Sequence, residues 1–180
     1  MSVGLGISGL AASIGVGLIF LTSGWAKFRN RTALEGVVAN YRILPQSLVL
    51  PVAIALPYVE VAVGAALVAG LGAIPALAAI ALLLAFAAAM AVNVRRGRAH
   101  IDCGCGLSAL RQPLSHMLVA RNLILAALLA LRLPPALSLS GAEIAAAGVG
   151  GLALFLCYLL FNAVGMLSHS SAAAFRRHHS

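Results

Sequence analysis

The sequence carries very little charge for its length. Only 9% of its 180 residues are charged and 62% are apolar, which lies far outside the composition of soluble globular chains. Its acidic residues number four and are Glu35, Glu60, Asp102 and Glu143. This scarcity of charge excludes an ordinary soluble domain and indicates a membrane protein.

Signatures of several other protein classes are also missing. The chain has no patch of interleaved basic and aromatic residues, no glycine loop followed by a phosphate-binding lysine, and no Ser-His-Asp arrangement. The net charge of +8 comes from Lys and Arg residues that lie between apolar runs. Such charges report membrane topology rather than nucleic-acid binding. We therefore expect a lipid bilayer as the surroundings and no nucleic-acid partner.

The apolar runs have the length of membrane-spanning helices. A bilayer core of about 30 Å requires roughly twenty helical residues. The N-terminal run lacks a positively charged leader region, so we interpret it as a retained span. The sequence predicts an all-α polytopic membrane bundle, a single domain over 1–170 with a polar basic tail over 171–180. The expected spans are 4–24, 48–71, 73–94, 114–133 and 143–167.

Proline and glycine shape the second and third spans. Gly70, Gly72 and Pro75 predict a tight turn that makes these spans an antiparallel hairpin. Pro51 and Pro57 lie in the first half of the second span, where they should kink the helix or free backbone carbonyls.

The fourth span is the weakest, because polar residues such as Arg121 and Asn122 interrupt it. Four spans plus an interfacial helix would explain the same residues. Five spans, however, place the basic segments 25–47 and 95–113 and the C-terminal arginines on one side, with only Arg132 opposite. The positive-inside rule then puts the N-terminus outside the cell and residues 100–106 at the cytoplasmic end. We prefer five spans in the inner (plasma) membrane.

The stretch HIDCGCG at 100–106 is the main candidate for chemistry. Cα atoms of Cys103 and Cys105 lie no more than about 7 Å apart, within disulfide range, although so small a ring is strained. Gly104 and Gly106 permit the sharp backbone turn that the ring requires. Because strained disulfides are easily reduced, the pair is predicted to be an exchanging dithiol.

The neighbouring residues allow two interpretations of this stretch. Nearby arginines and His100 favour a thiolate, whereas Asp102 opposes it. Alternatively, His100, Asp102, Cys103 and Cys105 offer mixed donors for copper or zinc, but the usual C-x₂₋₄-C spacing and a second ligand pair are missing. Cys157, within an apolar run, is interpreted as a small apolar residue.

Glu60 is the only acid well inside a span. Burying an unpaired charge in a bilayer costs at least about 2.5–3.5 kcal/mol, so a partner is expected, and we predict Arg121. The pair would form a proton or quinone-headgroup site, or would only fix helix register. Trp25 and Tyr41, near span ends, are predicted to be interfacial anchors.

Four segments resemble the MauE family of methylamine-utilisation membrane proteins, which has DoxX-like relatives. They are GWAKFRN, YRILP, LPYVEVAVGAAL and NVRRGRAHIDCGCG, and the resemblance covers about residues 10–125. It implies a helical inner-membrane protein that matures the small, multiply disulfide-bonded subunit of an exported amine dehydrogenase with a thioredoxin-like partner, MauD. It also implies that Cys103 and Cys105 are the redox pair, and it assigns no role to Lys27 or Glu60.

The resemblance conflicts with the predicted topology. The family's work is expected in the periplasm, whereas the charge count places the cysteine pair at the cytoplasmic face. The loop could fold back into the membrane, electrons could cross it through Cys157 or a quinone, or the topology could be reversed. Two hypotheses follow: a membrane thiol-disulfide redox protein, or a non-enzymatic module that binds a metal or docks a partner during maturation.

Overall fold

The computed structural model describes residues 3–103, 113–134 and 139–177, with side chains placed as far as Gly165. The described parts form six helices and no named strand. The helices are α1 (Val3–Arg29), α2 (Arg31–Tyr41), α3 (Gln46–Val68), α4 (Ala73–Arg95), α5 (His116–Ala130) and α6 (Gly141–Arg177). The predicted all-α fold is confirmed.

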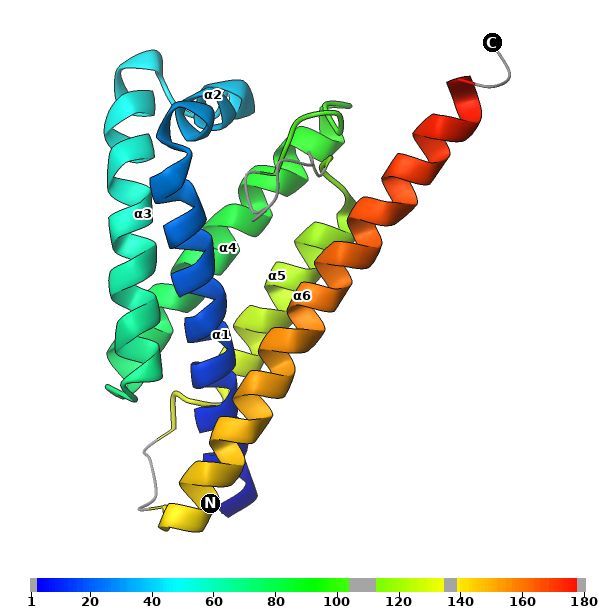
Figure 1. Ribbon diagram of the computed structural model, residues 1–180. Coiled ribbons are helices and arrows are strands. Elements are labelled where there is room, and N and C mark those ends of the chain that lie inside the picture. The colour runs from blue at the N-terminus through cyan, green and yellow to red at the C-terminus, as the bar shows by residue number, and fades with distance from the viewer. Residues whose placement is uncertain (1–2, 104–112, 135–138, 178–180) are drawn as a thin grey trace.

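Four helices are long and apolar enough to cross a membrane: α1, α3, α4 and the part of α6 up to Gly165. The fifth predicted span, 114–133, is the shorter helix α5 of 15 residues, which Ser115 caps by accepting a hydrogen bond from the Leu118 N–H. Figure 1 shows α5 running antiparallel to α4 and alongside α6. Four membrane-length helices and one shorter apolar helix agree with the predicted polytopic bundle, and the choice between five spans and four spans plus an interfacial helix stays a prediction.

The two ends of the bundle differ in what they hold. One end carries α2, the end of α4 and the start of α5, and the other carries the N-terminus and the α3–α4 turn (Figure 1). In that turn Gly70 and Gly72 adopt positive φ values of 72° and 85°, a conformation that glycine adopts without strain. The predicted tight turn is confirmed. Helix α3 continues through both Pro51 and Pro57.

Helix α2 was not predicted, because its sequence was interpreted as part of a charged connection. Leu34, Val37, Val38 and Tyr41 recur at helical spacing along it and point into the bundle, where they line a cavity. Arg98 donates a hydrogen bond to the Asn40 carbonyl at 2.8 Å. Arg96 likewise contacts the Arg42 carbonyl at 3.4 Å. These contacts at the C-terminal end of α2 hold the helix over the bundle.

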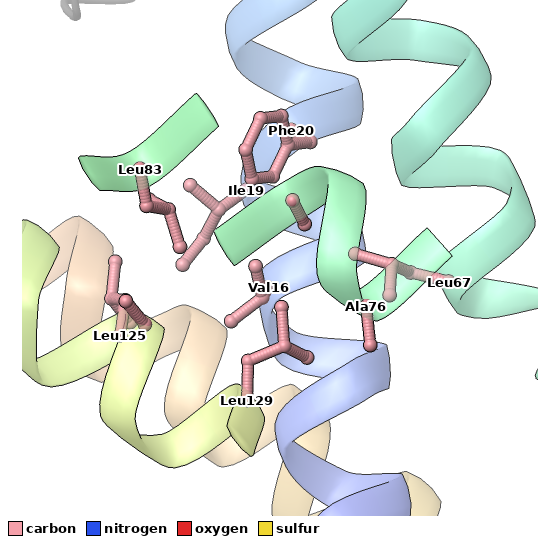
Figure 2. Packing of buried hydrophobic residues seen from close by; sticks show 10 residues of the cluster. Val16, Ile19, Phe20, Leu67, Ala76, Leu83, Leu125 and Leu129 are labelled. Carbon is pink, nitrogen blue, oxygen red and sulfur yellow. The ribbon is translucent and has the colours of Figure 1, made fainter. Parts of the chain in front are cut away.

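Close glycine contacts hold α1 against two neighbours. A Cβ atom on Gly64 of α3 would lie 2.8 Å from the Gly17 carbonyl oxygen, and one on Gly15 would lie 2.8 Å from the Gly151 carbonyl of α6. Small residues thus permit backbone contact, the usual mode of helix association in membranes. Figure 2 shows the core beside these contacts, where Val16 and Ile19 of α1 meet Leu125 and Leu129 of α5.

Candidate functional site

A buried ion pair joins α1 to α3. The Lys27 ammonium donates hydrogen bonds to both carboxylate oxygens of Glu60, each at 2.7 Å, and to the Ser23 hydroxyl at 2.7 Å. Glu60 is 1% exposed and Lys27 8%. These three bonds use all three donors of the ammonium group. The carboxylate is therefore charge-paired inside the bundle, as a buried acid in a membrane requires.

Gly24 explains why the helices approach closely enough for this pair. A Cβ atom at Gly24 would lie 3.1 Å from the Pro57 carbonyl oxygen and 3.2 Å from the Glu60 Cβ. Lys27 lies three residues further along α1, on the same helix face. The small residue therefore brings α3 within reach of the lysine one turn later.

The salt-bridge partner of Glu60 is Lys27. The prediction of Arg121 as this partner was wrong. The sequence predicted that the first span ends at residue 24, so Lys27 was interpreted as a basic residue of the following loop. Helix α1 instead continues to Arg29, and Lys27 is buried. Arg121 of α5 donates to the Asn162 side-chain oxygen at 2.5 Å and lies 4.9 Å from the Tyr158 ring centroid. Both contacts tie α5 to α6.

Lys27, Glu60 and Arg121 nevertheless line one cavity of about 350 Å³. Most of its wall is apolar and comes from the first five helices, with Tyr158 from α6. Its polar members, besides those three, are Ser23, Tyr41, Cys103, Asn122 and Tyr158. The cavity therefore brings together several predicted site residues that are far apart in sequence.

The sequence-based prediction gave Asn122 no role beyond that of a polar residue interrupting the fourth span. It is 3% exposed and lies in the cavity wall. Among the described residues its amide nitrogen has no hydrogen-bond partner. Because buried donors are normally paired, this nitrogen is an available donor for a bound molecule.

Cys103 follows the end of α4 and lies in the wall of the cavity. Asp102 forms an isolated antiparallel bridge with Pro113, and the Leu114 N–H donates to the Ile101 carbonyl at 3.1 Å. The bridge brings the chain at Asp102 next to the chain at Pro113. The Cys103 residue is 7% exposed and belongs to a small apolar cluster with Met90, Ile101, Leu114 and Leu118.

Tyr41 contacts this segment directly. Its hydroxyl donates a hydrogen bond to the Cys103 carbonyl at 3.3 Å, and its side chain is half-buried in the cavity wall. The predicted role of Tyr41 as an interfacial anchor misses this contact. Trp25, by contrast, is 63% exposed near the end of α1, as expected for an anchor.

The remaining predicted site residues differ in burial, and some of them lie outside the described residues. His100 is exposed and Asp102 is half-buried. Cys105, Gly104 and Gly106 lie outside the described residues, so the predicted disulfide stays a prediction. Among the residues that the structure describes, no group of three or more His, Cys, Asp and Glu side chains gathers as a metal site. Cys157 is exposed on α6.

Comparison with known sequences assigns the chain to a family. The family model for methylamine utilisation protein MauE matches residues 5–135. The chain belongs to the MauE family. The matched region contains the ion pair, both loop cysteines and α5, whereas Cys157 lies beyond it. No solved structure matches the chain.

Individual MauE proteins are similar over different lengths. The chain is 44% identical over 172 residues to methylamine utilization protein MauE of Paracoccus denitrificans, covering 91% of this chain and 90% of that protein. It is 41% identical over 91 residues to MauE of Paracoccus versutus, covering 48% and 49% of the two chains. For MauE of Methylorubrum extorquens the identity is 42% over 89 residues, covering 48% and 46%.

The sequence signals for the missed MauE site residues differ. The spacing of Leu34, Val37, Val38 and Tyr41 is a helical pattern that would have revealed α2. Lys27 was present in the resembling segment GWAKFRN, next to the small residues Ser23 and Gly24. Its pairing with Glu60 depends on the approach of two helices, which no local pattern in the sequence encodes.

Proposed function

We propose that this chain is a thiol-disulfide redox protein of the inner membrane that takes part in methylamine utilisation. Cys103 and Cys105 cycle between dithiol and disulfide, exchanging with a thioredoxin-like protein. Through that partner the protein supports disulfide formation in an exported amine dehydrogenase subunit. The family membership and the four membrane-length helices support the broad role, and the cysteine chemistry goes beyond them.

One observation carries the redox proposal. Cys103 directly follows the Asp102–Pro113 bridge and lies in the wall of an internal cavity. A cysteine that was only core packing would need no cavity beside it and no polar, glycine-rich continuation. The position puts Cys103, although largely buried, directly beside the cavity.

The exchange itself needs no further component. A thiolate of the pair attacks the partner's disulfide, so that an intermolecular sulfur–sulfur bond forms, the partner's own disulfide breaks and the partner's second sulfur is left as a thiolate. The second cysteine then attacks the mixed disulfide and releases the partner fully reduced, or the reverse sequence oxidises the partner. The direction is set by the relative reduction potentials of the two pairs.

Substitution of each loop cysteine tests the proposal. In cells that mature the dehydrogenase subunit, Cys103→Ser and Cys105→Ser should abolish maturation or trap a mixed disulfide, visible on non-reducing gels. The matched control is Cys157→Ser, because Cys157 is exposed on α6 and lies away from the cavity. Full maturation in both loop variants would overturn the redox proposal.

Thiol labelling tests the side of the membrane. The segment that carries Cys103 lies at the same end of the bundle as α2 (Figure 1), and the basic residues at that end favour the cytoplasm. A membrane-impermeant maleimide should label the reduced loop thiols of a Cys157→Ser variant from the cytoplasmic side of intact vesicles. Labelling from the periplasmic side alone would reverse this orientation and place the pair on the side to which the dehydrogenase subunit is exported.

A further inference from the structure

The internal cavity has properties that thiol exchange with a protein does not use. Its volume of about 350 Å³ lies within the range of small-molecule sites, and most of its wall is apolar. Leu82, Leu83 and Phe86 of α4 supply part of that wall from the middle of a membrane-length helix. A ligand of this cavity is therefore a largely apolar molecule that lives in the bilayer.

The cavity is reached from the side of the bundle. Helices α3 and α4 meet at their turn and diverge towards the opposite end (Figure 1). Ile43 and Ala85 both line the cavity and are exposed on the surface, Ile43 by 45%. At these residues the cavity meets the outside of the protein. A lipid-soluble molecule can enter there without passing through water.

The polar groups of the cavity, Arg121 and Asn122 among them, offer hydrogen-bond donors to a ligand with acceptor oxygens. Lys27 and Glu60 neutralise each other, and Ser23 takes the remaining ammonium donor. The Asn122 amide nitrogen has no acceptor among the described residues. A carbonyl oxygen is the natural partner for such a donor.

We propose that this cavity binds an isoprenoid quinone, which serves as the electron acceptor for the cysteine pair. This inference rests on the proposed function, because it names what reoxidises the dithiol. Two S–H bonds break and one S–S bond forms, releasing two electrons and two protons. The quinone takes both, and its two carbonyl oxygens become the hydroxyl groups of the quinol.

Blocking the cavity provides the main test. The full-length protein in lipid nanodiscs is titrated with decylubiquinone, a soluble quinone with a short tail, and bound quinone is quantified after rapid separation. Ala89→Phe fills the cavity, whereas Ala88→Phe adds the same ring at the neighbouring exposed position of α4, which does not line it. We expect Ala89→Phe to lose saturable binding and Ala88→Phe to retain it.

A second variant tests the polar contact. Asn122→Leu keeps the side-chain size but removes the donor, and it should weaken decylubiquinone binding about fivefold, as the loss of one hydrogen bond predicts. Equal affinity of all variants, or displacement of the quinone by oleate at equal concentration, would overturn the assignment. In the second case the cavity would be a fatty-acid site.

Binding and electron transfer are separated by the cysteine variants. Cys103→Ser should still bind decylubiquinone but should no longer convert it to quinol, which is followed by the ultraviolet absorbance of the quinone. If the reduced wild-type protein binds decylubiquinone but forms no quinol, the cavity is a quinone site, and the quinone is not the electron acceptor of the cysteine pair. Quinol formation that persists in Ala89→Phe would place the reaction elsewhere and overturn the cavity proposal.

Discussion

The two halves of the bundle use different packing. In the half that contains Gly15, Gly17 and Gly64, backbones touch and a continuous apolar core fills the space between α1, α3, α4 and α5 (Figure 2). Helices α3 and α4 diverge away from their turn (Figure 1). In the half that contains Lys27, Glu60 and Cys103, these residues line a cavity. The close packing of α1 on α3 thus continues into both halves, at Gly17 and at Gly24, whereas only the half with the cavity leaves room for a ligand beside Cys103.

The largest effect should come from unpairing the ion pair in the open half. Lys27→Met leaves the Glu60 carboxylate buried without its ammonium partner, and we expect a loss of about 3–5 kcal/mol in unfolding free energy. Unfolding in mixed detergent micelles, followed by circular dichroism, measures this loss. The double variant Lys27→Met/Glu60→Leu should recover most of it. A single variant as stable as wild type would mean that the open half does not depend on this pair.

The next effect tests the backbone contact in the close-packed half. Gly64→Ala places a Cβ atom 2.8 Å from the Gly17 carbonyl oxygen, so the helices must separate, at a cost of about 1–3 kcal/mol. Gly148→Ala in α6 is the control, because a Cβ atom there meets no atom within 4 Å. The control should be neutral or up to about 1 kcal/mol more stable, because Ala favours helix over Gly. Equal thermal unfolding midpoints for Gly64→Ala and Gly148→Ala would show that the backbone contact at Gly64 does not stabilise this half.

A smaller effect should appear where α2 meets the cysteine segment. Tyr41→Phe removes the hydrogen bond to the Cys103 carbonyl, so the rate of maleimide labelling at Cys103 should rise about fivefold, equivalent to about 1 kcal/mol. The measurement uses a background lacking the other two cysteines. Tyr58→Phe is the control, because Tyr58 is 53% exposed on α3 and does not line the cavity. Equal rates in both variants would show that Tyr41 does not hold the segment.

The smallest effect belongs to a side-chain bond in the close-packed half. Ser13 donates from its buried hydroxyl to the Leu67 carbonyl at 3.0 Å. Ser13→Ala should cost about 0.6 kcal/mol, the average for interhelical hydrogen bonds in a membrane protein. Ser8→Ala, whose hydroxyl bonds within its own exposed helix turn, should change stability less in the same unfolding assay. A loss above that of Gly64→Ala would mean that polar bonds, rather than backbone contact, hold this half.

The sequence predicted the membrane helices well because hydropathy is a local property. The expected third span, 73–94, is the helix Ala73–Arg95, and the turn at Gly70 and Gly72 was predicted from residue type alone. Helix α2 was missed because charged residues flank its apolar face, although that face has a regular helical period.

The candidate site was only partly accessible from the sequence. Cys103 and Glu60 were found because each is chemically unusual in its surroundings. The predicted partner of Glu60 was wrong, because the actual pairing with Lys27 depends on the close approach of two helices at Gly24, which is a tertiary effect. The cavity was not foreseen at all, since its wall comes from several helices that are far apart in sequence.

The shortness of α5 has a consequence for where the membrane surface lies. Its 15 residues extend about 22 Å, roughly 8 Å less than the hydrocarbon thickness of a typical bilayer. The shortfall requires either local thinning of the lipid or non-helical backbone below the headgroups. At the α5 start, the Ser115 cap and the Asp102–Pro113 bridge already satisfy backbone groups in the way that such depth demands. A short α5 of this kind would favour a membrane surface that dips towards the segment carrying Cys103.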